Sequence, residues 1–206
     1  KMSSGSTPLH MAASSGAVEA VQLLLRLGAR VDAVDKDSTP LLCALARNQA
    51  EVVRTLLAAG ADPDQVDDKG EAFLLLACKE SSPATVCELL RGGANVCVRG
   101  SVRSTPLCCA VARREDVSVL KLLLGAGVDV NEEDPRTGLT PLMLAVIKNR
   151  SEAVHELLVW GADPEVRTTV PAPGIPLGAR ARDFAWRPCP NPKVLRLLER
   201  PPALLS

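Results

Sequence analysis

The sequence predicts an all-α protein, a solenoid of stacked helix–turn–helix units with projecting hairpin-like loops. A Thr-Pro dipeptide returns at residues 7, 39, 105 and 140, and closing glycines at 28, 60, 93, 127 and 161 follow at steps of 32, 33, 34 and 34 residues. The chain is 47% hydrophobic but only 2% aromatic, which is typical of thin layers of small helices. Since one such unit cannot bury its own apolar face, successive units are expected to stack.

Each unit follows the same local rules. Its Thr can cap the first helix through the hydroxyl, and the Pro that follows suits the first helical turn. The first helix ends at a break, at Gly16, Asn48 or Asn149, because Gly and Asn tolerate the left-handed conformation. A second helix with Leu residues at helical spacing follows, and a polar segment such as residues 61–70 then projects.

Six units are expected in one domain over residues 1–206, at about 5–28, 29–60, 61–93, 94–127, 128–161 and 162–200. In the third, Glu71-Ala72-Phe73-Leu74 is aligned with Thr7-Pro8-Leu9-His10. In the sixth, Arg180-Ala181 stands for Thr-Pro, after a Pro-rich insertion at about 164–179. Its prolines exclude a regular helix, so it is either a surface loop that tolerates insertion or a contact loop for partner choice.

The period, the Thr-Pro-Leu-His start, the central break, the paired leucines and the Gly-Ala-Asp at 60–62 and 161–163 resemble the ankyrin-repeat family. The resemblance covers about residues 7–200 and is weaker in the third and sixth units. It implies a non-enzymatic scaffold that binds a partner protein or peptide in a groove. In the family this groove is lined by the tips of the projecting segments and the exposed end of each first helix.

No catalytic, cofactor-binding or metal-binding constellation is found. The sequence lacks a Gly-rich phosphate loop, an HExxH motif and a nucleophile elbow. His10 is expected to tie the turn of one unit to its neighbour, and His155 is expected to be exposed. Asp62, Asp64, Asp67 and Asp68 lack the order of a calcium loop and are expected to form a solvated acidic turn.

Composition limits the partners and the compartment. Lys plus Arg and Asp plus Glu both total 24, and aromatic residues that stack on bases are scarce, which argues against nucleic acid as a ligand. No apolar run is long enough for a membrane span. The seven cysteines form no CxxC pair, which favours reduced core thiols in the cytoplasm or the nucleus.

Cations recur at the end of the first helices. In this alignment Ser15, Arg47, Lys79, Arg113 and Lys148 share one position. They are either solvated residues that suit the negative end of a helix dipole, or a basic ladder that binds an acidic or phosphorylated segment.

A second candidate site is Asn131, a candidate for hydroxylation. It follows Leu123, Asp129 and Val130 in a turn that resembles the substrates of an asparaginyl hydroxylase. The alternative is an Asn that forms the turn by bonding to its own backbone.

The wider context is predicted by resemblance as well. The cysteine-rich units and the end of the chain, LLERPPALLS, are similar to the end of the array in the ankyrin-repeat and SOCS-box family. This implies the substrate-recognition subunit of a cullin-RING ubiquitin ligase, with elongin and cullin bound through a downstream box. The alternative is the regulatory arm of a larger signalling protein, enzyme or channel. Residues 21–25 are also too apolar for an end unit, which predicts a longer ankyrin protein.

Overall fold

The computed structural model describes residues 6–35, 38–99, 104–113, 116–135, 137–170, 174–185, 191–200 and 202. Its contacts divide the chain into two compact units, residues 1–101 and 102–206. Regular secondary structure within the described ranges consists of helices, with no β-strand among them, so the all-α prediction is confirmed.

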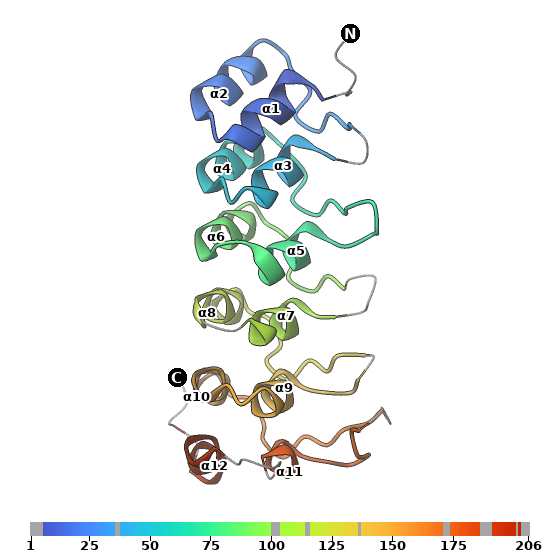
Figure 1. Cartoon of the computed structure of the whole chain (residues 1–206), viewed down its shortest axis with the longest axis vertical. Helices are drawn as coiled ribbons and strands as arrows, with labels where there is room; N and C mark the ends of the chain where they lie inside the picture. The colour runs from blue at the N-terminus through green and yellow to red at the C-terminus, as the bar shows by residue number, and fades with distance from the viewer. Residues whose placement is uncertain are drawn as a thin grey trace. The chain divides into compact units, whose positions relative to one another are not determined.

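Unit 1 is a stack of three helix pairs. The pairs are α1 (Pro8–Ser15) with α2 (Val18–Arg26), α3 (Pro40–Ala46) with α4 (Ala50–Ala58), and α5 (Phe73–Glu80) with α6 (Pro83–Arg91). First helices contact first helices, α1 on α3 and α3 on α5, while α2 packs on α4 and α4 on α6 (Figure 1). The projecting segments leave the stack on the side of the first helices, so those helices and segments share one face (Figure 1).

Unit 2 repeats this arrangement. Its pairs are α7 (Pro106–Ala112) with α8 (Ser118–Gly125), α9 (Pro141–Ile147) with α10 (Ser151–Val159), and α11 (Ala181–Phe184) with α12 (Pro192–Glu199). α9 contacts both α7 and α11, and α10 contacts α12. Pro188 and Pro190 lie outside the described residues, and Pro192 is the first residue of α12.

The predicted Thr caps are confirmed in the second, fourth and fifth repeats, and the predicted breaks at Gly16, Asn48 and Asn149 are confirmed as well. The hydroxyls of Thr39, Thr105 and Thr140 accept hydrogen bonds from the backbone N–H three residues later, and a Pro opens each of these helices. Gly16, Asn48 and Asn149 adopt the left-handed conformation with φ of 78°, 56° and 57°. Each of these residues therefore ends a first helix and turns the chain back into the second.

His10 connects the first two repeats, as expected. Its Nε2 lies 3.1 Å from the Ser38 carbonyl oxygen, which can only accept, so Nε2 carries the proton. Nδ1 is then an acceptor and receives the Thr7 hydroxyl at 2.9 Å and the Thr7 N–H at 3.3 Å. The ring is buried, and these bonds satisfy both of its nitrogens.

Replacing His10 with leucine, the residue that Leu42 supplies at the same place in α3, is expected to destabilise unit 1 by about 1–3 kcal/mol. The loss arises because the half-buried Ser38 carbonyl and the Thr7 N–H lose their partners. Urea unfolding followed by circular dichroism measures it, and His155→Leu on the exposed side of α10 is the control. An unchanged midpoint in His10→Leu would contradict this role.

The third repeat corrects the sequence alignment. The residue that precedes α5 is Ala72, so Ala72 and Phe73 occupy the places of Thr and Pro, and the alignment of Glu71 with Thr7 is wrong by one position. The projecting segment is longer here: Gly60 to Ala72 is 12 residues, where Gly28 to Thr39 is 11.

Glu71 instead lies just before the cap and is buried. Its side chain forms an ion pair with Lys79 Nζ, which reaches back from the last turn of α5. The Glu71 N–H donates to Asp67 Oδ1 at 2.8 Å, and the Glu71 carbonyl accepts from the Asp67 N–H at 2.9 Å. Because a buried carboxylate is costly unless it is paired, Lys79 supports the fold of this repeat.

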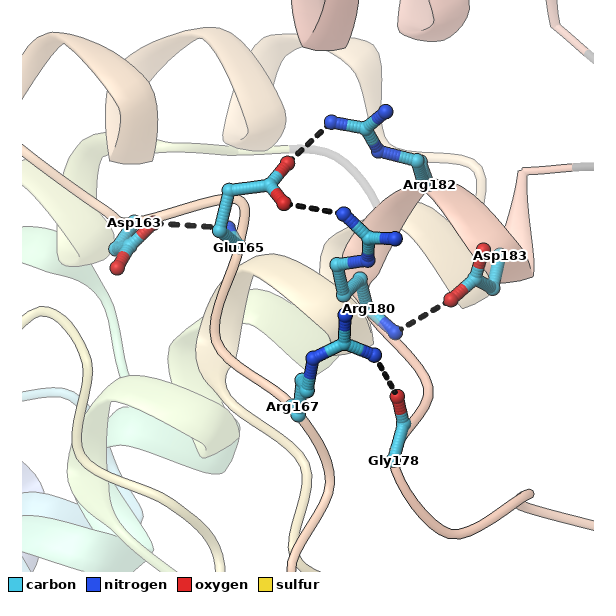
Figure 2. A network of polar contacts seen from close by, with 7 residues as sticks. All are labelled: Asp163, Glu165, Arg167, Gly178, Arg180, Arg182 and Asp183. Atoms are coloured by element: carbon cyan, nitrogen blue, oxygen red, sulfur yellow. Dashed lines mark hydrogen bonds and ion pairs between the residues drawn. The ribbon is translucent and has the colours of Figure 1, made fainter.

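The Pro-rich insertion is held as a hairpin at its base. The Thr168 N–H donates to the Ala179 carbonyl at 2.9 Å, and the buried Thr168 hydroxyl accepts from the Ala179 N–H at 3.0 Å. Figure 2 shows Glu165 between the guanidinium groups of Arg180 and Arg182, while Arg167 donates to the Gly178 carbonyl at 2.9 Å. No helix forms in the described parts of the insertion, as its prolines predict.

The ion pairs of Glu165 with Arg180 and Arg182 make the stability of unit 2 depend on pH with a known sign. Hydrogen bonding from Arg180 is the first cause that lowers the pKa of Glu165 below its ordinary value of 4.5. A carboxylate whose pKa is lowered by folding stabilises the folded state at pH values above its ordinary pKa. This stabilisation is lost as the pH falls through the folded pKa. Glu165→Gln is therefore expected to lower the melting temperature of unit 2 at pH 7, and this difference should shrink as the pH is lowered below 4.5 and through the folded pKa. A difference that stays constant as the pH falls would contradict the stabilising role of these ion pairs.

The described cysteines are free thiols. Cys78, Cys108 and Cys109 are buried, Cys43 and Cys87 are half-buried, and Cys97 is exposed. Burial raises the pKa of Cys108 to about 12, so this thiol stays protonated and unreactive. Cys189 lies outside the described residues.

Candidate protein-binding surface

The exposed end of each first helix carries the candidate binding residues. With Ala72 as the cap of α5, the position eight residues after each cap is held by Ser15, Arg47, Glu80, Arg113 and Lys148. Glu80, not Lys79, therefore shares this position in the third repeat. The predicted run of four cations is wrong at that repeat, because an acidic residue interrupts it and Lys79 is used by Glu71.

In unit 1 the structure brings Ser15 and Arg47 together. Both line a shallow depression of about 490 Å³. Its other lining residues come from the N-terminal turn and the first helices: Ser6, His10, Met11, Ser14 and Cys43. Met11 is 61% exposed, so an apolar side chain and a cation lie on the same depression.

The Arg47 guanidinium is available to a partner. Arg47 follows α3 directly and is exposed. Its side chain makes no hydrogen bond or ion pair within the part of the chain that the structure describes. The negative end of the α3 dipole stabilises the positive charge of Arg47, which gives one structural reason for a cation at this position.

In unit 2 the two predicted cations differ. Lys148 follows α9, is exposed, and has no ion pair to any described residue. Arg113 follows α7, is half-buried and lies near Asp116. Hydrogen bonds from Ser118 lower the pKa of Asp116 first, and the charge of Arg113 lowers it further. Lys148 is therefore the more accessible cation of unit 2.

Asn131 lies in a turn that connects two repeats of unit 2. Its backbone N–H donates to Asp129 Oδ1 at 2.9 Å, and its Oδ1 accepts from the Asp163 N–H of the next repeat at 2.8 Å. In unit 1, Asp64 makes the same bond, accepting from the Asn95 N–H at 2.7 Å. The Asn131 side chain thus bonds across repeats, which the sequence interpretation missed because it considered only its own turn.

The described aspartates of the acidic segment bind backbone N–H groups. The Oδ1 atoms of Asp62, Asp64 and Asp67 accept backbone N–H bonds in the projecting segments. No three His, Cys, Asp or Glu side chains gather as metal ligands in the ranges that the structure covers. Among those same residues, none of the helices is both long and apolar enough to cross a membrane.

Comparison with known proteins agrees with this geometry. A family model described as ankyrin repeats in three copies matches residues 1–67 and 73–168. The chain belongs to the ankyrin-repeat family. It is therefore an ankyrin-repeat domain, a protein–protein interaction module, and the fold predicted from sequence is confirmed.

Solved ankyrin domains have a similar fold. The ankyrin repeat domain of Bcl-3, a member of the IkappaB protein family, superposes with a TM-score of 0.79 at 30% identity, covering 97% of this chain and 87% of that one. The human ASB11 ankyrin repeat domain gives 0.71 at 28% identity, with 94% and 83% covered.

Curated relatives are longer. Protein PhlB of Serratia liquefaciens is 30% identical over 136 residues, 65% of this chain and 60% of that protein. The nuclear factor NF-kappa-B p105 subunit of Gallus gallus is 34% identical over 163 residues, 79% of this chain and 13% of that protein. This ankyrin chain thus spans less than two thirds of each.

Proposed function

We propose that this ankyrin domain is a non-enzymatic scaffold that binds an acidic or phosphorylated segment of a partner protein on the face of its first helices. The observation that supports it most is the depression of unit 1, where exposed Met11 adjoins Arg47, a cation without a partner among the described side chains. An apolar side chain of the partner would cover Met11 while a carboxylate or phosphate pairs with the guanidinium. Arginine suits such anions because its planar fork can donate two parallel hydrogen bonds.

The serines that line the depression would set the orientation of the bound segment. Ser14 and Ser15 line the depression beside Arg47, and the Ser15 hydroxyl donates to the Ala12 carbonyl at 3.1 Å. A hydroxyl that donates inside the helix still has lone pairs for a partner N–H. In unit 2, Lys148 and Arg113 are proposed to attract the same kind of segment.

The test of this proposal is a peptide array that varies phosphoserine, Glu and Ala within otherwise identical sequences. Arg47→Glu is expected to weaken binding of the acidic peptides about tenfold and to lower their salt dependence, since the pair contributes charge attraction. Arg26→Glu, an exposed arginine on α2, is the matched control. Equal binding by Arg47→Glu and the unmodified chain would reject the site, as would a preference for the Ala peptides.

We propose the cytoplasm or the nucleus as the compartment, and substrate recognition in a cullin-RING ubiquitin ligase as the setting. The free thiols support the compartment, since thiols persist where glutathione keeps them reduced. The likeness to human ASB11 supports the ligase setting. Elongin and cullin that copurify with the whole protein would support it, and their absence would favour the alternative, a regulatory arm of a larger signalling protein, enzyme or channel. The likeness to Bcl-3 is compatible with that alternative.

We also propose Asn131 as a target of an asparaginyl hydroxylase. Its half-buried place in the turn supports this, and the bond to the Asp163 N–H means that the turn must open for the enzyme. Peptide mass spectrometry on protein from cells with active hydroxylase should show one added oxygen at Asn131. Asn131→Asp retains the cross-repeat acceptor and is the control, as Asp64 does this in unit 1. An unmodified Asn131 peptide would reject the assignment.

A further inference from the structure

Two guanidinium groups converge on one carboxylate at the base of the Pro-rich insertion. Glu165 forms ion pairs with Arg180 through Oε2 and with Arg182 through Oε1 (Figure 2). Arg180 directly precedes α11, and Arg182 is the second residue of that helix. These two residues, which we call the arginine pair, therefore already bind an anionic group of their own chain.

The turn that carries Glu165 does not depend on the arginine pair. Its backbone N–H donates to Asp163 Oδ1 at 2.8 Å, and the Asn131 N–H makes the same bond to Asp129 Oδ1 at 2.9 Å in the repeat before it. The Glu165 side chain is 48% exposed, so it can leave the arginine pair and enter solvent while the bond to Asp163 persists. The carboxylate is thus a ligand that another anion can displace.

Arg180 has a donor that Glu165 does not satisfy. Its Nε atom is buried, although the whole side chain is 28% exposed, and it has no hydrogen-bond partner among the described residues. A buried donor without an acceptor is costly, so an acceptor placed there would be stabilising. Glu165 cannot be that acceptor in its present position, because each of its two oxygens already faces one guanidinium.

A phosphate monoester fits these donors better than a carboxylate does. It has three terminal oxygens and a charge of about −1.5 to −2 at pH 7. One oxygen can pair with Arg180 Nη1, one with Arg182 Nη2 and one with the unsatisfied Arg180 Nε. Charge-assisted bonds from arginine to phosphate are among the strongest hydrogen bonds in proteins.

The surroundings stay positive when Glu165 leaves. A third arginine, Arg167, donates to the Gly178 carbonyl two residues before Arg180 (Figure 2). The two other carboxylates of this network, Asp163 and Asp183, each accept a backbone N–H, at 2.8 and 2.7 Å. Three guanidinium groups then stand against two carboxylates, which favours a dianionic ligand.

We propose that the arginine pair is a binding site for a phosphoserine or phosphothreonine of a partner protein, and that Glu165 occupies this site as an internal ligand in the free domain. An exposed apolar residue supports a protein segment as the source of the phosphate. Leu177 is 66% exposed and precedes Gly178, so a segment gains an apolar contact beside the phosphate that a free phosphate ion lacks. The site lies in unit 2 and does not depend on the site proposed at Arg47.

The test follows the Nε–H signal of Arg180 in nitrogen–proton NMR spectra while a peptide is added, at about pH 6.5, where most of the phosphate is dianionic. The probe is a five-residue peptide with phosphoserine between two leucines. The same peptide with Ser or Glu at that place, and inorganic phosphate, are the comparisons. The phosphopeptide is expected to shift the signal to saturation and to bind about tenfold more tightly than the Glu peptide or inorganic phosphate.

Variants locate the binding. Glu165→Gln removes the internal carboxylate and should tighten phosphopeptide binding about tenfold, whereas Arg182→Gln should weaken it by about the same factor. Arg196→Gln, at an exposed arginine on α12 of the same unit, is the matched control and should bind as the unmodified chain does. Circular dichroism at the temperature of the titration checks that each variant is folded.

Three results would overturn the proposal. An Arg180 signal that does not respond to the phosphopeptide, in the unmodified chain or in Glu165→Gln, would reject the site. Inorganic phosphate that binds as tightly as the phosphopeptide would assign the site to a free ion, and equal binding of the Glu peptide would remove the preference for phosphate. Because the Arg180 signal reports this site alone, binding or failure to bind at Arg47 leaves the outcome unchanged.

Discussion

Replacing Phe73 with alanine is expected to destabilise unit 1 by about 3–5 kcal/mol, the cost of truncating a buried ring and leaving a cavity. Phe73 is the first residue of α5, where the neighbouring first helices have Pro, and it is only 1% exposed. The ring therefore fills space inside the stack and does not merely start the helix. Urea unfolding monitored by circular dichroism measures the loss, with Val34→Ala, 70% exposed in the same unit, as control.

The control should change stability by less than about 0.5 kcal/mol, as exposed truncations do. A loss of stability below about 1 kcal/mol in Phe73→Ala would contradict the assigned packing, because the cavity left by a buried phenyl ring lowers the stability of the fold. Since each described helix pair packs mainly on the adjacent pairs, the change should appear first as faster exchange in α5 and α6.

Replacing Lys79 with glutamate is expected to destabilise unit 1 by about 2 kcal/mol or more, because it removes the cation from a buried carboxylate and adds a like charge. Glu71 has a side chain only 5% exposed, whereas that of Lys79 is 34% exposed, so solvent screens part of the effect. Arg47→Glu, at an exposed residue with no partner among the described side chains, should leave the unfolding midpoint nearly unchanged. The comparison separates a cation that supports the fold from one that can serve a partner.

A double variant tests the same pair from the other side. Glu71→Ser with Lys79→Ser reproduces the serines that Ser6 and Ser14 supply at these positions in the first repeat. It should recover a large part of the stability lost in Lys79→Glu, because no buried charge is left without a partner. Stability as low as in the single variant would mean that the ion pair is not the reason for the loss.

The sequence by itself determined the repeat and its local conformations. Thr-Pro caps, left-handed Gly16, Asn48 and Asn149, and leucine spacing are signals that depend on a few neighbouring residues. Such signals can be interpreted without knowing what lies across the stack. The bond from His10 to Ser38 was also foreseeable, since the Thr-Pro-Leu-His start resembles a family motif with that arrangement.

Only the tertiary structure decided the register of the third repeat and the roles of its charges. Without a Thr-Pro signal, Glu71 and Ala72 are equally good starts, and the choice depends on burial of Phe73 and on the pairing of Glu71 with Lys79. The same holds for the depression at Met11 and Arg47. Whether a side chain at a given helical position is buried, paired or open depends on the neighbouring repeat, and that contact is absent from any local stretch of sequence.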